Sequence, residues 1–267
     1  MTNQKQFSGS WGIILGGSSG FGFATLQKLA RLGMNVAILY RETAAADNAL
    51  KENLSRIASA NGITILPYNM NALDREGRRS FLLEFTAIVE HQPVVRLLLH
   101  SIARGNLKPL LPSEGKSALS MEDVELTSYA MAGSLLDWSR DLLHAGLFGT
   151  AGRIIGLTSE GAHKYWEGYG AVSIAKASLE SLATYMAVEF AKHGLRTNVI
   201  QAGMTDTPAL ARIPGIATLM ESAAQRNPLG RVTLPEDVAN AVYLLCTDEA
   251  SWINGALLHV DGGEHCR

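Results

Sequence analysis

Seven short apolar runs alternate with amphipathic stretches along this chain of 267 residues. A continuous apolar run is typical of a strand buried on both faces, and apolar residues spaced three and four apart indicate helices. Strands that alternate with helices pair in parallel, because each helix carries the chain back to the start of the next strand. The strands are therefore expected at Trp11–Leu15, Val36–Tyr40, Ile63–Tyr68, Val94–His100, Arg153–Leu157, Arg196–Ile200 and Ala256–Val260.

The intervening helices are expected to cover both faces of one doubly wound α/β sheet, and an α+β fold with the same elements is the alternative. They are predicted at Phe23–Leu32, Ala44–Ala60, Arg75–His91, Glu122–Ala145, Val172–Lys192 and Pro235–Cys246. No repeat, low-complexity tract or linker divides the sequence, which predicts a single domain over residues 1–267. The segment 205–227 lacks strand character, and we expect it to form a substrate-binding lid.

Charge and cysteine content argue against several classes of protein. The chain has 23 basic and 25 acidic residues, so it lacks the basic excess of a nucleic-acid-binding protein. Its two cysteines, Cys246 and Cys266, do not have the spacing of a zinc site, and no metal is expected. Two isolated thiols, a polar N-terminal segment and the lack of any apolar run near ~20 residues predict a cytoplasmic protein that does not associate with membranes.

A glycine-rich turn follows the first expected strand and leads directly into the first expected helix. It reads Gly16-Gly17-Ser18-Ser19-Gly20-Phe21-Gly22. Glycines at such a place let the backbone turn tightly, approach a pyrophosphate and pack the helix close to the strand, while the helix N-terminus offers N–H groups to phosphate. The sequence therefore predicts a Rossmann-like dinucleotide site formed by Gly16, Ser18, Ser19, Gly20, Phe21 and Gly22.

Motifs beyond this turn resemble those of the short-chain dehydrogenase/reductase family over nearly the whole chain. They are Asn198-Val199-Ile200 with Gly203 and Thr207, Pro235-Glu236-Asp237-Val238, Asn254-Gly255 and Val260-Asp261-Gly262-Gly263. The resemblance implies a nicotinamide dinucleotide cofactor, with Gly203, Thr205 and Thr207 along its nicotinamide and pyrophosphate. It also implies that Asn69 and Met70 lie against the adenine, although Asn69 stands where the family has an acidic residue.

Two departures from the common pattern of this family resemble its divergent branch, the enoyl-acyl-carrier-protein reductases. The usual Tyr-x3-Lys pair is absent, and Tyr169 stands seven residues before Lys176 instead. After the fourth strand the chain reads His100-Ser101-Ile102-Ala103 rather than an N-N-A-G-type turn. The resemblance implies that Tyr169 and Lys176 are catalytic, and that Ser101, Ile102, Ala103 and Lys176 contact the cofactor.

The longer spacing suits the reduction of an enoyl thioester. Hydride is added at C3 while negative charge develops on the thioester oxygen several bonds away, so the acid must lie farther out than in a ketone reductase. Three additional residues correspond to about one helical turn. The resemblance implies that Tyr169 stabilises the enolate oxygen, while Lys176 binds the nicotinamide ribose and lowers the pKa of the phenol.

The substrate side is expected to combine hydroxyl groups near the thioester with apolar side chains over the acyl chain. The expected residues are Ser159, Tyr169, Leu210, Ile213 and Met220. For the apolar residues, ordinary helix packing is the alternative. Several enzymes of this branch carry a second tyrosine at the position of Ser159. For Ser159 itself, the alternative to binding the substrate carbonyl is a structural role at the end of a strand. Tyr165 competes with Tyr169 as the acid, although packing is its favoured role.

The end of the second expected strand favours NADPH over NADH. That strand ends in Leu39-Tyr40-Arg41-Glu42. An NADH enzyme usually has an acidic residue here to accept the ribose hydroxyls, whereas Arg41 can pair with a 2′-phosphate. Glu42 is the competing residue, because its carboxylate could accept the ribose hydroxyls instead.

Taken together, these features predict NAD(P)H-dependent reduction of a trans-2-enoyl thioester in fatty-acid synthesis, with acyl-carrier protein or coenzyme A as the carrier. The alternatives are a short-chain carbonyl or hydroxysteroid reductase and a nucleotide-sensing protein without turnover. The resemblance also implies a homotetramer that pairs through the helices Glu122–Ala145 and Val172–Lys192. The first of these helices carries more apolar surface than one sheet-facing stripe needs, at Met131, Leu135, Leu136 and Trp138.

Overall fold

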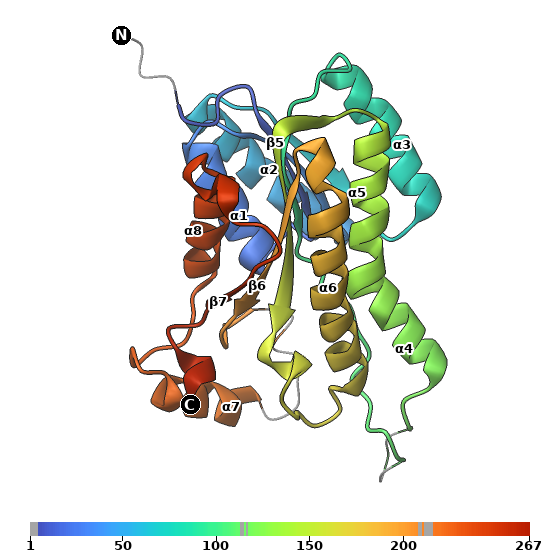
Figure 1. Ribbon diagram of the computed structural model, residues 1–267, viewed down its shortest axis with the longest axis vertical. Helices are drawn as coiled ribbons and strands as arrows, with labels where there is room; N and C mark the ends of the chain where they lie inside the picture. The colour runs from blue at the N-terminus through green and yellow to red at the C-terminus, as the bar shows by residue number, and fades with distance from the viewer. Residues whose placement is uncertain (1–4, 113–114, 116, 208–209, 211–215) are drawn as a thin grey trace.

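The sheet at the centre of the molecule is parallel throughout and has the strand order β3-β2-β1-β4-β5-β6-β7. The computed structural model describes residues 5–112, 115, 117–207, 210 and 216–267. Within these residues the strands are β1 (Trp11–Leu15), β2 (Asn35–Tyr40), β3 (Ile65–Asn69), β4 (Val95–His100), β5 (Phe148–Ser159), β6 (Arg196–Ala202) and β7 (Leu257–Val260). The predicted doubly wound α/β fold is therefore confirmed (Figure 1).

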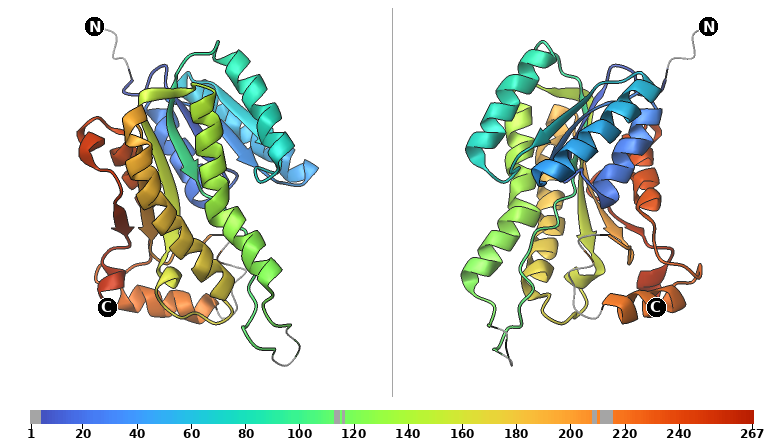
Figure 2. Two further views of the ribbon diagram at one scale, coloured as in Figure 1. Left: turned by 45° about the vertical axis from the view of Figure 1, so that its right-hand side comes forward. Right: turned by 180° about the vertical axis from the view of Figure 1, so that it is seen from behind.

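Helices cover both faces of this sheet. One face carries α1 (Gly20–Arg31), α2 (Ala44–Asn61) and α8 (Pro235–Cys246), and the other carries α3 (Arg75–Ile88), α5 (Ser134–His144) and α6 (Gly170–Glu189). Figure 2 shows α1 and α2 on the side opposite α5 and α6. Two further helices, α4 (Met121–Ser128) and α7 (Ile216–Arg226), lie toward the carboxyl ends of the strands. No helix of the described residues is both long and apolar enough to cross a bilayer.

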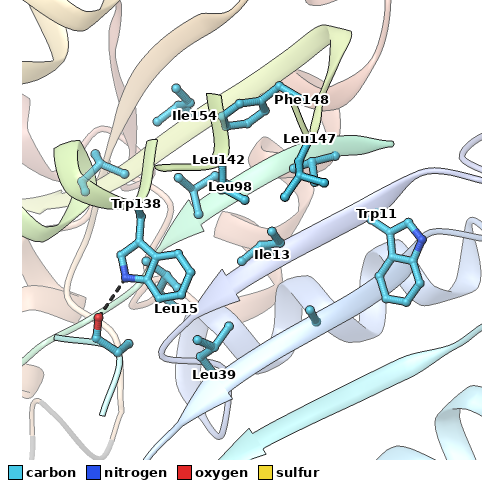
Figure 3. Close-up of a cluster of buried hydrophobic side chains, with 14 of the residues drawn as sticks. Trp11, Ile13, Leu15, Leu39, Leu98, Trp138, Leu142, Leu147, Phe148 and Ile154 are labelled. Carbon is cyan, nitrogen blue, oxygen red and sulfur yellow. Dashed lines mark hydrogen bonds between the residues drawn. The ribbon is translucent and has the colours of Figure 1, made fainter. Parts of the chain in front are cut away.

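The sheet separates two apolar cores, as continuous apolar strands require. Ile13 and Leu15 of β1 point into the core under α3, α5 and α6, and Ile14 between them points into the core under α1, α2 and α8. All three side chains are fully buried. Trp138 of α5 fills the centre of the first core, and its indole N–H donates to the carbonyl of Ala72 at 2.8 Å (Figure 3). Burial on both faces explains why the strands read as apolar runs without alternation.

The predicted long helix at 122–145 is interrupted in the structure. A π-helical turn at Tyr129–Gly133 separates α4 from α5. A π turn adds one residue to the helical ladder, so the apolar residues before and after it do not share one 3.6-residue period. The sequence pattern was therefore wrong about continuity, although it located both segments.

The apolar residues cited for a dimer face on this helix are core residues instead. Leu135 and Trp138 are fully buried in the first core, and Leu136 packs against it. Met131 is 4 % exposed and lies in a separate buried cluster with Tyr169. The π turn orients α5 so that this stripe faces the sheet. These four side chains therefore give no support to an oligomer.

Two arginines attach the C-terminal end of α8 to the sheet. The Arg153 side chain of β5 is 1 % exposed and donates to the carbonyls of Leu245 at 2.7 Å and Thr247 at 3.1 Å. Arg96 of β4 donates twice to the carbonyl of Cys246, at 2.9 and 2.6 Å. Carbonyl groups at a helix C-terminus lack partners within the helix and attract cations. The two guanidinium groups therefore supply these missing partners.

We expect Arg153→Met to lower the free energy of unfolding by about 2–4 kcal/mol, because it leaves two buried carbonyls without a donor. The matched control is Arg140→Met, since Arg140 is exposed and has no hydrogen bond or ion pair among the described residues. That control should change stability by less than about 0.5 kcal/mol. Urea unfolding at one fixed protein concentration measures both, and equal effects would contradict the assigned role.

Candidate active site

Two adjoining cavities open at the carboxyl ends of the strands, where the strand order reverses between β1 and β4. This reversal is where open α/β sheets bind their ligands. The first cavity lies over the glycine turn and the end of β2, and the second lies over β5, β6 and the start of α6. Five residues line both cavities: Phe21, Ser101, Ile102, Ala103 and Thr207. One elongated ligand can therefore extend through both.

The glycine turn has the close contacts that a phosphate-binding turn requires. Gly16 has φ +85°, and a Cβ there would lie 2.5 Å from the carbonyl oxygen of Ser101. A Cβ on Gly22 would lie 2.3 Å from the carbonyl oxygen of Gly16. Ser19 precedes α1 and makes no side-chain cap bond, so the first N–H groups of the helix face the cavity side uncapped. Such N–H groups and the positive end of the helix dipole fit an anionic pyrophosphate.

Most of the predicted cofactor residues line one or both of the two cavities. Those that line the two cavities are Gly16, Ser18, Ser19, Gly20, Phe21, Arg41, Met70, Ser101, Ile102, Ala103, Lys176, Gly203, Thr205 and Thr207. Gly22 lies behind the turn, where it permits close packing rather than contact with a ligand.

Asn69 differs from its expected position. Its side-chain amide donates to the carbonyl of Glu42 and accepts from the N–H of Glu42, both at 3.0 Å. These two bonds hold the amide against the backbone that follows β2, and Asn69 lines neither cavity. Asn71, which the sequence reasoning missed, lines the first cavity instead. Only the position of Asn71 two residues beyond the strand end could have suggested it.

Tyr169 and Lys176 line the second cavity together. Tyr169 directly precedes α6, and its carbonyl accepts the Ser173 N–H at 2.8 Å, so the residue already belongs to the first turn. Its ring is 9 % exposed, and its hydroxyl lies 3.4 Å from the Ser159 hydroxyl at the end of β5. Lys176 is 7 % exposed, and its Nζ donates to the carbonyl of Leu157 at 2.8 Å. The helix and the neighbouring strand therefore fix both side chains in one wall.

Burial dominates the electrostatics of this pair. Desolvation raises the pKa of Tyr169 above its ordinary value, and the bond to Ser159 opposes this shift only partly. Lys176 is not among the groups that shift this pKa, so its expected effect on the phenol stays a prediction. Desolvation lowers the pKa of Lys176 to about 8, against the opposing charge of Glu180. Near neutral pH the phenol is a neutral hydrogen-bond donor and the lysine keeps most of its charge.

The competing candidates lie outside the reacting positions. Tyr165 is 88 % exposed and lines neither cavity, so neither catalysis nor the expected packing role fits it. His100 is buried with its Nε2 2.8 Å from the hydroxyl of Ser134, and burial lowers its pKa to about 3, which keeps the ring uncharged. His163 pairs with Glu180 at 2.7 Å.

Helix α7 lies within the segment expected to form a lid. Leu210 lines the second cavity, whereas Met220 is half-buried and does not line it. Ile213 lies outside the described residues. Of the predicted acyl-chain residues, Leu210 alone is thus located at the cavity among those that the structure describes.

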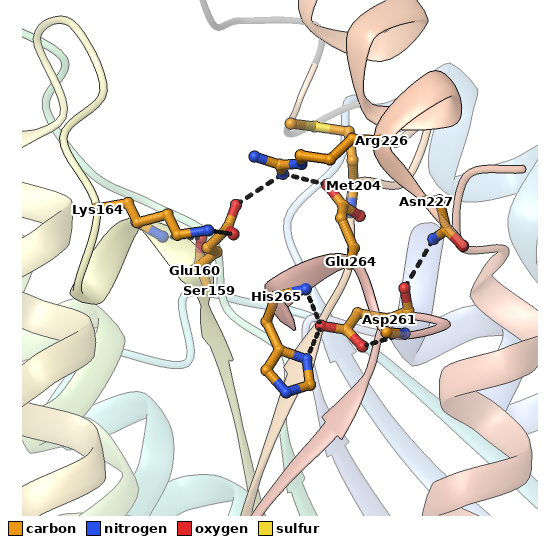
Figure 4. Close-up of polar contacts among 12 residues, drawn as sticks. Ser159, Glu160, Lys164, Met204, Arg226, Asn227, Asp261, Glu264 and His265 are labelled. Carbon is orange, nitrogen blue, oxygen red and sulfur yellow. Dashed lines mark hydrogen bonds and ion pairs between the residues drawn. The ribbon is translucent and has the colours of Figure 1, made fainter. Parts of the chain in front are cut away.

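A network of charged groups, which the sequence analysis did not anticipate, attaches the end of α7 to the cavity wall (Figure 4). Arg226 is 3.0 Å from a carboxylate oxygen of Glu160 and 2.5 Å from one of Glu264. Glu264 also accepts from the Met204 N–H at 3.1 Å, and Glu160 pairs with Lys164. Because these residues come from four separate segments, no local motif could have revealed the network.

The sequence matches the family described as enoyl-(acyl carrier protein) reductase over residues 16–265. The protein belongs to this family. It is thus an oxidoreductase of the short-chain dehydrogenase/reductase superfamily, whose cofactor is a nicotinamide dinucleotide. The two adjoining cavities, the glycine turn and the uncapped helix N-terminus fit such a cofactor.

Comparison with individual proteins gives the same fold and more than one activity. The enoyl-[acyl-carrier-protein] reductase [NADH] of Aquifex aeolicus is 37 % identical over 169 residues, which span 63 % of this chain and 62 % of that relative. The crystal structure of an enoyl-[acyl-carrier-protein] reductase (NADH) from Aquifex aeolicus superposes with a TM-score of 0.82 at 28 % identity, covering 98 % of each chain. The cis-4-hydroxycyclohexanecarboxylate dehydrogenase of Sinomonas cyclohexanicum is 30 % identical and covers 94 % of both chains.

We expect Lys176→Met to stabilise the protein at pH 7 in the absence of cofactor, by about 2–6 °C in the unfolding midpoint. The pKa of Lys176 is about 8 in the folded state against an ordinary 10.5. Below pH 8 folding therefore buries a charged ammonium group, which lowers the free energy of unfolding. Between pH 8 and 10.5 this cost disappears, and the advantage of the variant should disappear with it. Calorimetry at pH 7 and pH 10 tests this, with the exposed Lys192→Met as control; a gain that is independent of pH would contradict it.

Proposed function

We propose that this protein uses NADPH to reduce the C2–C3 double bond of a trans-2-enoyl thioester. The observation that carries the proposal is the location of the Tyr169 hydroxyl in the second cavity, with Lys176 seven residues later in the same wall. Membership of the enoyl-(acyl carrier protein) reductase family supports the reaction class. The proposed carrier is acyl-carrier protein, with coenzyme A as the alternative.

The neutral phenol of Tyr169 suits the charge that develops in this reaction. The bound cofactor would supply hydride to C3, and the electron pair of the double bond would move toward the thioester oxygen. A Tyr169 hydroxyl held in a buried wall can donate to that oxygen as its charge grows, which favours the transition state over the substrate. The resulting enolate then takes a proton from water at C2, which completes the saturated thioester.

The proposed role of Lys176 is to hold the cofactor rather than to transfer a proton. The carbonyl of Leu157 fixes its Nζ at 2.8 Å, and the ammonium group keeps further N–H donors for ribose hydroxyls. The proposed roles of Ser101, Ile102 and Ala103 are contacts at the junction of the two cavities, which these residues line. The proposed lid is the segment 205–227, attached at its end through Arg226.

Ketone reduction is a second candidate that two observations favour. The hydroxyls of Ser159 and Tyr169 are 3.4 Å apart, so they can donate together to one carbonyl oxygen. The relative from Sinomonas cyclohexanicum, which covers 94 % of the chain, is named as a dehydrogenase of a hydroxy acid. Both candidates use the same wall, and they differ in the carbon that receives hydride.

Tyr169→Phe should lower the turnover of crotonyl thioester by about 10²–10³-fold while the dissociation constant of NADPH stays nearly unchanged, because the donor acts mainly in the transition state. Ser159→Ala is the matched variant, and enoyl reduction should tolerate it better than the loss of Tyr169. Offering crotonyl and acetoacetyl thioesters side by side with NADPH tests the reaction class. Preference for acetoacetyl thioester would favour the ketone reductase, and crotonyl turnover unaffected by Tyr169→Phe would remove this residue from the chemistry.

Arg41 is the proposed ligand of a 2′-phosphate. It lines the first cavity at the end of β2 and has no ion pair with another described residue. Glu42 lines the same cavity, but the Asn69 side chain bonds both the N–H and the carbonyl of Glu42 and so fixes its backbone. The relative from Aquifex aeolicus is named as an NADH enzyme, so the cofactor preference proposed here differs from that of this relative.

We expect Arg41→Ala to raise the Michaelis constant for NADPH at least about 10-fold and to change that for NADH by less than about 2-fold, because it removes a charged hydrogen bond to the phosphate alone. The matched variant Glu42→Ala should leave the Michaelis constant for NADH nearly unchanged, because the proposal assigns no ribose contact to Glu42. Steady-state kinetics with both cofactors measures the difference. Equal effects on NADPH and NADH would identify Arg41 as a surface cation only.

The proposed homotetramer rests on apolar side chains that the chain leaves exposed. Ile174, Tyr185 and Val188 lie along one face of α6 at 47–74 % exposure, and Met121 and Leu126 of the adjacent α4 are 71 % and 61 % exposed. A patch of this kind marks an interaction surface. Light scattering at micromolar concentration should give the mass of four chains, Tyr185→Glu should lower it, and a monomeric mass for the unaltered protein would contradict the assembly.

A further inference from the structure

The end of β7 and the short turn after it bring two imidazole rings and a carboxylate together. His259 lies on β7, Asp261 directly follows the strand, and His265 belongs to the 3₁₀ turn Glu264–Cys266. One nitrogen or oxygen of each lies within 4.8 Å of those of the other two. These three residue types are the ligands that borderline divalent metal ions prefer.

The carboxylate of Asp261 is held in one orientation. Its Oδ1 accepts the N–H of Gly263 at 3.0 Å, and its Oδ2 accepts the backbone N–H of His265 at 3.1 Å. The same Oδ2 lies 2.7 Å from the Nδ1 of His265 (Figure 4). Asp261 is 3 % exposed, so its position is set by the turn and not by solvent. A buried, oriented carboxylate bonded to an imidazole nitrogen fixes the orientation of that ring.

The ring of His259 completes the group from the strand side. It stacks on the ring of His265 with 3.8 Å between the ring centres and an angle of 15° between the planes. Ligands at about 2.0–2.2 Å from a tetrahedral zinc ion are about 3.3–3.5 Å apart. The pair Asp261–His265 would have to open by about 0.6–0.8 Å, and the exposed ring of His259 would have to leave its stacked position to reach the ion.

The group is also accessible. Asp261 and His265 line the active-site cavity, and all three residues line a separate cavity on the other side of β7 that includes Asn227 and Asp237. An ion can therefore reach the group from solvent without entering the active site. Glu264, which belongs to the same turn, is bonded to Arg226 and to the Met204 N–H.

We propose that His259, Asp261 and His265 form a binding site for a divalent transition-metal ion such as Zn²⁺, with one ligand atom from each residue and water in the remaining position. The ion binds these ligands in their deprotonated forms, as metal ions require. The site borders the active-site cavity but shares no residue with the Tyr169 and Lys176 wall. The expectation of no metal, which rested on cysteine spacing alone, did not consider a set of ligands of this kind.

The test uses the full chain without an affinity tag, freed of metal by a chelator and titrated with Zn²⁺ against a chromogenic competitor. We expect one tight site per chain. His259→Ala and His265→Ala should each weaken it by at least about 100-fold, because the loss of even an outer-shell partner costs 10–100-fold. Two controls should keep the affinity: His144→Ala, which removes an exposed histidine at the end of α5, and Cys266→Ser, which removes the thiol 3.4 Å from His265 Nε2.

A second measurement separates a lost site from a lost fold. Zn²⁺ should raise the thermal midpoint of the unaltered protein and of both controls, since an ion that binds only the folded state stabilises it. It should leave the midpoints of His259→Ala and His265→Ala unchanged, while their midpoints without metal match the unaltered protein. Equal binding by all variants would show adventitious surface binding, and loss in Cys266→Ser would assign the ion to the thiol; either result overturns the proposed ligand set.

Discussion

The contact between the glycine turn and the chain after β4 is the constraint on which the site depends. At Gly16 the backbone of the first turn lies so close to Ser101 that no side chain fits between them. Here the sheet order reverses, and the crevice that opens is lined by both segments. If the glycine turn lay farther from the chain after β4, the two cavities would be separated, because Ser101, Ile102 and Ala103 form the junction between them. The position of the crevice is thus set by backbone geometry before any side chain contributes.

The second cavity depends on a different physical balance. Tyr169 and Lys176 are both buried, and burial disfavours the charged form of each. Both residues lie in or next to the N-terminal part of α6, and the carbonyl of Leu157 on the neighbouring strand fixes the lysine there despite the desolvation penalty. Groups held in this way cannot turn toward water when a ligand arrives. The two side chains therefore keep one arrangement in the cavity wall, at the expense of the stability of the fold.

Sequence patterns predicted those parts of the molecule that depend on local chemistry. The apolar runs located all seven strands, and the glycine turn located the dinucleotide crevice, because each pattern reflects a constraint that acts within a few residues. The π turn at Tyr129–Gly133 escaped detection, since the insertion of one residue changes the face of α5 without changing its composition. The position of Asn69 also escaped it, because the partner of the amide is the backbone of another strand end. Contacts between distant segments, such as that of Arg226 with Glu160 and Glu264, leave no trace in either segment alone.

The single guanidinium shared by two carboxylates has a consequence for how the cavity can open. Glu264 is 3 % exposed and has no other cationic partner among the described residues, so displacing Arg226 would leave a buried negative charge without compensation. Glu160 keeps Lys164, and the two carboxylates would then face each other across the cavity wall. A buried unpaired charge is costly, which opposes any motion that detaches the last turn of α7. The C-terminal end of α7 is thus anchored to the cavity wall. Any opening of the cavity that moves this helix must therefore rotate it about Arg226 rather than detach it.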